Sequence, residues 1–289
     1  MQIGIDIGGT SIKGGLVDNG QIVKRFKTCT DISRGFESLK EAIFKVVEEL
    51  LKCGDVDKIG ISSAGDINPL TGEVIYATNV LPNYIGQNVA KDVQQKFNLP
   101  TFIMNDAMCA LVGEMFCGVA VGYNNVLMLT LGTGVGGEVA IDKKVLMGEG
   151  FRGSRLGHIK YNRENRACAC GEIGCVECFI SATGLIATAK KFGVKISDCN
   201  QLFNDEINND LIIAIVNQFT TDLAKIVDMF AELYNVDIIV IGGGLINTAE
   251  FWWQLFLQKV KTNIVIKQAQ LKNDAGIIGA TIITEKKCF

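Results

Sequence analysis

One histidine and a run of cysteines have the residue types and the spacing of a metal site. The chain has ten cysteines and a single histidine, His158, and four cysteines lie close together shortly after it: Cys168, Cys170, Cys175 and Cys178. Thiolate and imidazole ligands in a tetrahedral set suit Zn²⁺. In a chain that is neither short nor secreted, such a run favours a metal site over disulfides. Four protein ligands leave no open position, so the zinc would be structural.

The cysteine run leaves two points open. Cys178 lies one helical turn beyond Cys175, and we interpret it as a packing residue rather than a fifth ligand. The cysteines could also be free thiols without a metal, and a lone histidine is more often structural than functional. If His158 binds a metal through one ring nitrogen, the other ring nitrogen can donate to a substrate.

Three glycine-rich turns follow apolar runs that predict strands. Glycines let backbone N–H groups approach an anion closely, and a threonine adds a hydroxyl. Each turn alone could be a plain hairpin turn, and none matches the usual patterns of P-loop or dinucleotide-binding proteins. Three such turns together indicate a bound nucleotide. Their residues are Asp6, Gly8, Gly9 and Thr10; Gly132, Thr133 and Gly134; and Gly242, Gly243 and Gly244.

A carboxylate, Asp106, follows the predicted strand 101–105 and opens a predicted helix. Aspartate is favoured at a helix N-cap, and on composition alone this structural interpretation is the better one.

Apolar periodicity predicts the elements that carry these residues. Two halves of the chain begin alike, each with a strand, a turn rich in glycine and threonine, and a second strand, so we predict an internal duplication. The turn Asp18-Asn19-Gly20 predicts a tight hairpin. The predicted strands are 2–7, 14–17, 21–26, 58–63, 101–105, a hairpin over 126–141 and 236–241, and the predicted helices are 36–53, 88–97, 107–116, 209–233, 250–260 and 275–284.

Composition sets limits on the class of protein. The chain has 289 residues, a 48% hydrophobic content and a formal net charge of −3. This length predicts about two domains, and the near-balanced charge gives no support for binding nucleic acid or an anionic membrane. The first residues lack the pattern of a targeting segment, and no uncharged run has the composition of a membrane span. We therefore expect a soluble, cytoplasmic protein.

Taken together, the motifs resemble the ROK family of sugar kinases, in the superfamily of actin, Hsp70 and hexokinase. The resemblance extends over the whole chain in the family's order, and the cysteine run with its upstream Gly-His pair is its most specific part. The matching stretches are residues 6–10, 105–107, 131–137, 157–158, 168–177 and 241–244.

The resemblance implies an α/β protein with the two-lobed actin-like ATPase (ribonuclease H-like) fold. In that fold, duplicated mixed-sheet domains have a cleft between them that holds the active site. We expect a smaller lobe of residues 1–116 plus 274–289 and a larger lobe of residues 117–273. The family also implies a homodimer, ATP with Mg²⁺ as substrate, and a structural Zn²⁺.

Residue roles follow from the same resemblance. Asp106 would be the general base, and His158, Cys168, Cys170 and Cys175 would hold the zinc. The three glycine-rich turns would bind nucleotide and phosphate, with Asp6 on the metal side and Lys13 nearby, although Lys13 could equally be a solvated surface residue. The sugar ligands would be Asn79, Asn105, Asp106, Arg155, His158 and Glu177. Asn79 could instead only shape a turn, and Glu177 could only stabilise the first turn of a helix.

One position departs from the family pattern Gly-Glu-x-Gly-His. Arg155 stands where a glutamate normally accepts hydrogen bonds from the 1- and 2-hydroxyls of the sugar. A guanidinium group only donates, so that recognition is lost or inverted. A donor would suit the carbonyl of an N-acetyl group at C2, or a phosphorylated or acidic sugar. The side chain could also turn to solvent and leave a degraded pocket.

The expected function is ATP-dependent phosphorylation of the 6-hydroxyl of a hexose or N-acetylhexosamine, with glucose and N-acetylmannosamine as the leading substrates. The main alternative is a catalytically silent sugar-binding protein of the same family, which Arg155 keeps open. A repressor of this family would carry a helix-turn-helix before the kinase-like part, and we expect no room for one. An Hsp70-like chaperone would leave the cysteine run unexplained.

Overall fold

The computed structural model describes residues 1–8, 11–31, 34–77, 83–153, 155–203 and 210–283, and its contacts divide the chain into two units. The first unit comprises Met1–Tyr123, Ala140–Gly153 and Gln270–Phe289, and the second comprises Asn124–Val139 and Ser154–Ala269. The lobe boundaries that we drew from the sequence pattern, near residues 116 and 274, stay a prediction.

The first unit contains a mixed sheet with the strand order β3-β2-β1-β4-β7. β1 pairs antiparallel with β2 and parallel with β4, and β4 pairs parallel with β7. Asn19 and Gly20 both have positive φ angles, so the predicted Asn-Gly hairpin turn is confirmed. The strands are β1 (Gln2–Ile7), β2 (Ser11–Asp18), β3 (Gln21–Cys29), β4 (Lys58–Ser63) and β7 (Thr101–Asn105), with the small hairpin β5 (Asp66–Ile67) and β6 (Val74–Tyr76) beside them.

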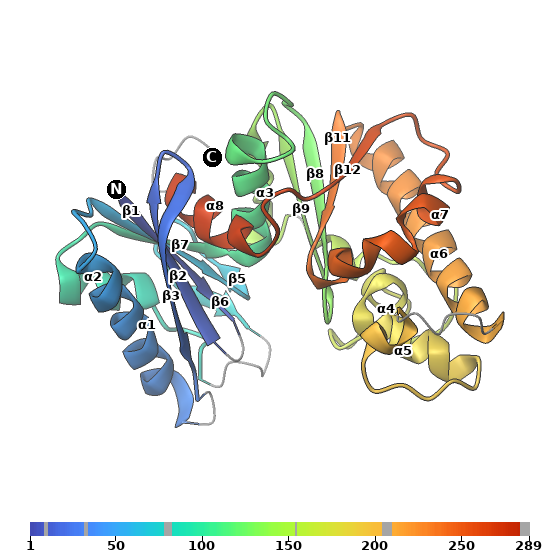
Figure 1. Cartoon of the computed structure of the whole chain (residues 1–289), viewed down its shortest axis with the longest axis horizontal. Helices are drawn as coiled ribbons and strands as arrows, with labels where there is room; N and C mark the ends of the chain where they lie inside the picture. The colour runs from blue at the N-terminus through green and yellow to red at the C-terminus, as the bar shows by residue number, and fades with distance from the viewer. Residues whose placement is uncertain (9–10, 32–33, 78–82, 154, 204–209, 284–289) are drawn as a thin grey trace. The chain divides into compact units, whose positions relative to one another are not determined.

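Helices cover both faces of this sheet (Figure 1). A methyl group on Gly14 would meet Val46 and Leu50 of α1, whereas one on the adjacent Gly15 would meet Ile277 of α8. Successive residues of a strand face opposite sides, so α1 and α8 lie on opposite faces. The helices are α1 (Gly35–Leu51), α2 (Val89–Phe97), α3 (Asp106–Cys117) and α8 (Ala275–Ile283).

The second sheet has the strand order β10-β9-β8-β11-β12. β11 pairs parallel with both β8 and β12. Chain order and sheet order therefore repeat those of the first sheet, an antiparallel set of three followed by two parallel strands, and the predicted duplication is confirmed. The strands are β8 (Val126–Leu131), β9 (Val135–Ile141), β10 (Lys144–Val145), β11 (Ile238–Gly242) and β12 (Val265–Gln268).

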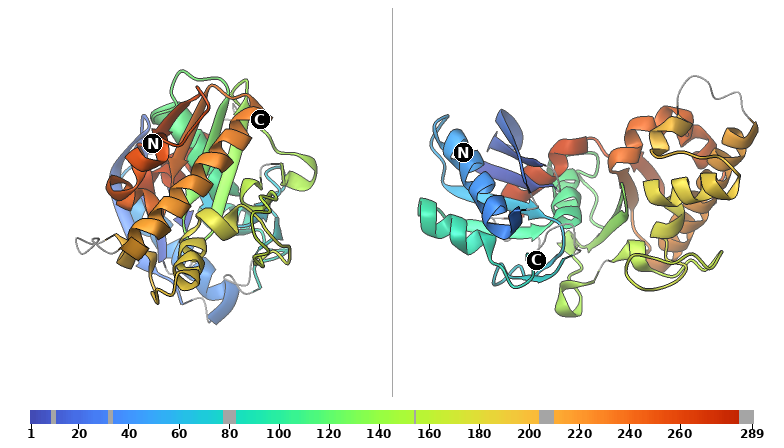
Figure 2. Two further views of the ribbon diagram at one scale, coloured as in Figure 1. Left: turned by 90° about the vertical axis from the view of Figure 1, so that its right-hand side faces the viewer. Right: turned by 90° about the horizontal axis from the view of Figure 1, so that it is seen from below.

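The long helix α6 lies across the strands of the second sheet (Figure 2). Trp252 is 1% exposed, and its ring meets that of Phe219 on α6 edge-on, with centroids 5.3 Å apart. Among the described residues, no helix combines the length and the apolar character that crossing a membrane requires. The helices of this unit are α4 (Glu177–Ile180), α5 (Ala182–Lys191), α6 (Asp210–Tyr234) and α7 (Trp253–Leu257).

Short elements account for most differences from the sequence prediction. The helix predicted over 250–260 is wrong in extent, because the 3₁₀ turn η5 (Gly244–Phe251) precedes α7 and Trp252 between them has non-helical backbone angles. Periodicity did not predict α4, α5 and β12, which are too short or too exposed to give a clear pattern. The other 3₁₀ turns are η2 (Glu149–Phe151), η3 (Leu156–His158), η4 (Cys199–Leu202) and η6 (Lys272–Asp274).

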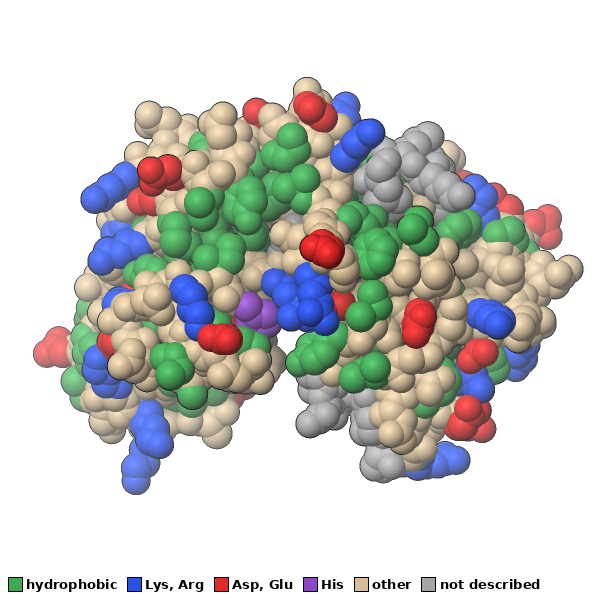
Figure 3. Space-filling model, turned by 180° about the vertical axis from the view of Figure 1, so that it is seen from behind, with side chains coloured by type: hydrophobic (Ala, Val, Ile, Leu, Met, Phe, Trp, Pro, Cys, Tyr) green, Lys and Arg blue, Asp and Glu red, His purple; other side chains and the backbone are tan. Residues whose placement is uncertain are grey.

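Charge is mixed over the surface. On the face drawn in Figure 3, basic and acidic side chains are interspersed with apolar ones. This distribution agrees with the near-balanced count of 28 basic and 31 acidic residues.

Candidate active site and metal site

Asp6 lies in the middle of a polar row on the first sheet. The strand register places Lys13 of β2 opposite it on one side and Ser62 of β4 opposite it on the other. Directly paired residues face the same side of a sheet, so the three side chains lie together. Ser62 Oγ donates to Asp6 Oδ1 at 3.2 Å, and Lys13 Nζ lies 3.9 Å from Asp6 Oδ2.

Asn105, and not Asp106, caps helix α3. Its Oδ1 accepts the backbone N–H groups of Ala107 and Met108 at 2.8 and 3.2 Å, and its Nδ2 donates to the carbonyl of Gly65 at 2.9 Å. Asp106 is the first helical residue, and its side chain is exposed. The N-cap role that composition favoured for Asp106 therefore belongs to its neighbour, while the Asp106 carboxylate accepts the N–H of Ala107 at 2.8 Å.

Both carboxylates have raised pKa values. For Asp6 the first cause is burial, opposed by Lys13, and repulsion from Asp106 adds to the rise. Protein atoms packed around Asp106 raise its pKa, and the N–H of Ala107 lowers it. Although these atoms crowd the carboxyl group, its side chain keeps contact with solvent.

The polar residues of the first unit gather at one edge of its sheet. Ile7, Ser63 and Asn105 end β1, β4 and β7 in register with one another. Ligands of open α/β sheets bind beyond such carboxyl ends. Gly8 begins the turn after β1, with its N–H bound to the carbonyl of Ser11 at 3.1 Å. Gly9, Thr10 and Asn79 lie outside the described residues.

Two glycine-rich turns of the second unit also lie at adjacent strand ends. Gly242 of β11 pairs with Thr130 of β8, so the triplet Gly242–Gly244 and the turn Gly132–Gly134 leave the sheet side by side. Gly243 has a φ of +88°, and any side chain there would overlap the backbone of Leu131. Gly243 and Gly244 are exposed, which leaves their backbone open to a flat ligand.

The four residues of the implied metal set do come together. One ligand atom each from His158, Cys168, Cys170 and Cys175 lies within 4.8 Å of the others. Cys168 Sγ is 3.7 Å from His158 Nδ1, and Cys170 Sγ is 3.8 Å from Cys175 Sγ. Zn–S bonds of about 2.3 Å in a tetrahedron put two ligands about 3.8 Å apart, so the set fits Zn²⁺.

The same cluster shows which histidine nitrogen faces the cysteines. It is Nδ1, so Nε2 of His158 is the nitrogen left for a substrate. Cys178 is not in the set and lies 3.6 Å from the carbonyl oxygen of Ala167. Burial raises the pKa of the Cys168 and Cys175 thiols, so these groups need a cation to become thiolates at neutral pH.

The remaining sequence-predicted residues flank this cluster. The N–H of His158 donates to the carbonyl of Arg155 at 2.9 Å, so Arg155 lies one 3₁₀ turn before the histidine and is half-buried. Glu177 opens α4, and its Oε2 accepts the N–H of Val135 at 2.9 Å. The structure thus brings Arg155, His158 and Glu177 together with the second glycine-rich turn in one unit, and Asp6, Lys13, Asn105 and Asp106 together in the other.

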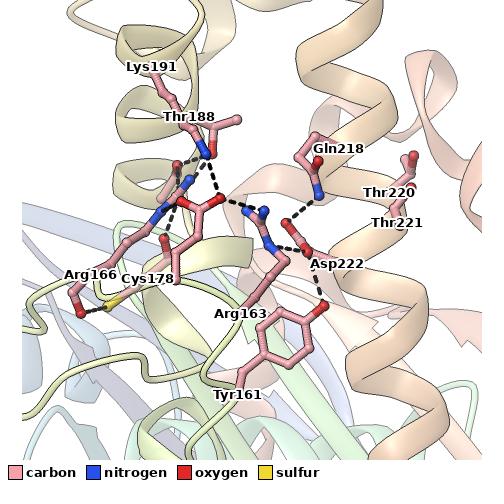
Figure 4. Close-up of polar contacts among 12 residues, drawn as sticks. Tyr161, Arg163, Arg166, Cys178, Thr188, Lys191, Gln218, Thr220, Thr221 and Asp222 are labelled. Carbon is pink, nitrogen blue, oxygen red and sulfur yellow. Dashed lines mark hydrogen bonds and ion pairs between the residues drawn. The ribbon is translucent and has the colours of Figure 1, made fainter.

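A partly buried network of charges ties the cysteine loop to α5 and α6 (Figure 4). Arg163 Nε lies 2.8 Å from Asp222 Oδ1, and Tyr161 donates to the same carboxylate at 3.0 Å. Arg166 donates to the carbonyl of Cys178 and to Thr188 Oγ1, each at 3.0 Å. This network could not be predicted from the sequence, because nothing in the spacing of the loop indicates partners on a helix far along the chain.

Breaking this network is expected to destabilise the fold. Asp222 is 1% exposed, and Asp222→Ala would leave Arg163 and Tyr161 without their shared partner. We expect a loss of about 3 kcal/mol in the free energy of unfolding, measured by urea denaturation. Glu48→Gln is the control, because Glu48 pairs with Lys96 at 2.7 Å on the surface and should change little. Equal urea midpoints of unfolding for both variants would contradict the prediction.

Two mixed sheets of repeated topology, with glycine-rich turns at their strand ends, define a protein of the two-lobed actin-like ATPase fold. Residues 2–287 match the model of the ROK family, and the chain belongs to that family. A glucokinase of Thermotoga maritima is 28% identical, with 99% of this chain and 97% of that protein covered. An N-acetylmannosamine kinase of Vibrio cholerae is also 28% identical, with 96% and 97% covered.

A solved structure extends the similarity to three dimensions. The ROK family glucokinase from Streptomyces griseus, in complex with glucose and AMPPNP, has a TM-score of 0.84 to this structure at 25% identity, with 99% of each chain covered. The family and the fold expected from the sequence are therefore confirmed, and these three similar proteins are named as sugar kinases.

Proposed function

We propose that this protein is an ATP-dependent kinase acting on the 6-hydroxyl of a hexose or N-acetylhexosamine, with Asp106 as general base. The observation that carries the proposal is that two adjacent residues at the start of α3 have different roles. Asn105 caps the helix, and Asp106 keeps an exposed carboxylate at the carboxyl end of β7. The similarity to kinases of glucose and N-acetylmannosamine supports the same class of substrate.

The proposed chemistry is a direct transfer. Asp106 accepts the proton of the 6-hydroxyl, the hydroxyl oxygen forms a bond to the γ-phosphorus, and the bond from that phosphorus to the β,γ-bridging oxygen breaks to release ADP. Mg·ATP is the second substrate, with Asp6 as the acidic residue on its metal side. Most of the remaining work is positioning and the neutralisation of charge, which backbone N–H groups of the glycine-rich turns can supply.

Some hydrogen-bonding groups of the proposed sugar ligands already have partners within the protein, and this limits what each ligand can offer to a sugar. Asn105 has both side-chain groups engaged by the backbone and also interacts with the Asp106 carboxylate, so a hydrogen bond to a sugar hydroxyl would share Nδ2 with these partners. His158 would donate from Nε2 while Nδ1 and the three cysteines hold a structural Zn²⁺, which cross-links the loop. Arg155 lies one turn from His158, where its guanidinium group can donate to an N-acetyl carbonyl.

The test is ATP-dependent phosphorylation across a panel of glucose, mannose, fructose, allose, N-acetylglucosamine and N-acetylmannosamine. Wild type should prefer an N-acetyl sugar, and Arg155→Glu should shift kcat/KM toward glucose by about tenfold or more, since it restores an acceptor. Lys144→Glu, a charge reversal at an exposed lysine, is the control and should leave the preference unchanged.

Other outcomes of the panel separate the alternatives. An unchanged preference in Arg155→Glu would refute the specificity role of this arginine. No phosphorylation of any sugar, together with calorimetric binding of one of them, would instead support the silent sugar-binding protein and would overturn the proposed kinase.

A further inference from the structure

The second glycine-rich turn is held in place by Glu177, near the end of the cysteine run, and by the first residues of α5. Glu177 Oε2 accepts the N–H of Val135 at 2.9 Å, and Thr183 Oγ1 donates to the carbonyl of Thr133 at 2.8 Å. The N–H of Ala182 donates to the carbonyl of Gly132, also at 2.8 Å. The first residues of α4 and α5 thus make three hydrogen bonds to the turn Gly132–Gly134 and to Val135, which follows it.

Glu177 is the member of this set that also touches the metal cluster. It follows Cys175 by two residues, and its Oε1 lies 3.7 Å from Cys168 Sγ. Its other oxygen lies against Gly134, where an added methyl group would overlap the carboxylate. One side chain therefore connects the cluster to the turn.

These bonds decide which N–H groups of the turn remain available. The N–H of Val135 is bound to Glu177, and the N–H of Gly132 is bound to the carbonyl of Gly134 at 2.9 Å. Within the described part of the chain, the N–H groups of Thr133 and Gly134 have no hydrogen-bond acceptor in the protein. Two consecutive N–H groups of a turn with fixed ends form a concave donor pair for an anion.

We propose that Glu177 is a positioning residue for the nucleotide: it fixes the turn so that the N–H groups of Thr133 and Gly134 bind a phosphate of ATP. This inference rests on the proposed function, and it gives Glu177 a second role beside that of a sugar ligand. The cysteine cluster then supports the phosphate turn as well as the sugar-binding loop, because Cys175, two residues before Glu177, is one of its members.

Amide hydrogen exchange of the zinc-loaded protein, measured by NMR without sugar, tests the inference directly. The Val135 amide should exchange slowly in wild type and in Glu177→Gln, which retains an acceptor, and at least about tenfold faster in Glu177→Leu. Mg·ATP should protect the amides of Thr133 and Gly134 in wild type. Unchanged exchange of Val135 in Glu177→Leu would overturn the proposal, as would Mg·ATP that binds without protecting these two amides.

A second pair of variants avoids any effect on sugar contacts or on folding of the cluster. Among the described residues, the Thr183 hydroxyl bonds only to Thr133 and Ser181, so Thr183→Val should raise the KM for ATP about tenfold while the KM for sugar and the zinc content stay constant. Thr183→Ser keeps the hydroxyl and should behave as wild type. Equal KM values for ATP in both variants would contradict the proposal.

The same experiments distinguish a failure of the proposed function from a failure of this inference. If wild type binds no Mg·ATP, the kinase proposal falls and the nucleotide part of this inference falls with it. The exchange rate of Val135 in Glu177→Leu still shows whether Glu177 holds the turn.

Discussion

Replacing Asp106 by asparagine is expected to lower kcat by about two to four orders of magnitude. Asparagine has nearly the same shape but cannot accept the proton of the attacking hydroxyl. Asn105 supplies the helix cap, so the start of α3 should remain intact in the variant. We therefore expect the KM values for sugar and Mg·ATP, and the unfolding midpoint, to stay close to those of wild type, as steady-state kinetics and thermal denaturation can show.

The control for this variant is Asp92→Asn. Asp92 is likewise an acidic residue in the first turn of a helix of the same unit, so its loss removes a similar interaction with the helix dipole. It should leave kcat unchanged. If Asp106→Asn keeps kcat within about tenfold of wild type, Asp106 is not the general base.

The pH profile follows from the direction of the pKa shift. The surrounding protein raises the pKa of Asp106, so the carboxyl group gains its proton at a higher pH than an ordinary aspartate does. Only the ionised form accepts a proton, so kcat/KM should be constant above the raised pKa and fall tenfold per pH unit below it. Asp106→Asn should lack this acidic limb. A limb that persists in the variant would assign it to another group.

Much of the fold could be predicted from the sequence, because the long elements have clear apolar periodicity. The helix expected over 36–53 is α1, with Leu39, Ile43, Val46 and Leu50 buried as the pattern required. The duplication was visible as two strand–turn–strand starts and is matched by the two sheets. Short elements such as β12 and α4 were missed, since a few half-exposed residues give no period to detect.

The site was predictable where a local motif carries the chemistry. The spacing of the cysteines and His158 was enough to expect a cluster, and the four ligand atoms do meet. Contacts between distant segments were not predictable in this way. The bond from Glu177 to Val135 joins residues 42 positions apart, and that from Tyr161 to Asp222 joins residues 61 apart. Such pairs depend on how α4 and α6 pack, which no single stretch of sequence states.

Removal of one cluster ligand is expected to have the largest effect on stability. Cys175 is fully buried, so Cys175→Ser would remove a zinc ligand where no water can easily replace it. Binding of a structural metal contributes folding free energy directly. We expect wild type to contain about one zinc per chain, and the variant to contain less than about half and to unfold at least about 10 °C lower.

The variant Cys178→Ser tests whether Cys178 is a zinc ligand or only a neighbour of the cluster. Cys178 lies in α4 and is half-buried; its thiol contacts backbone carbonyls and the Cys168 thiol, but it does not belong to the set of four ligand atoms. It should keep the zinc content of wild type in elemental analysis and lose little stability. Zinc loss in both variants would make Cys178 a ligand. Wild-type protein that holds no zinc, and gains no stability from added zinc, would instead show that the four residues form a cluster of free thiols.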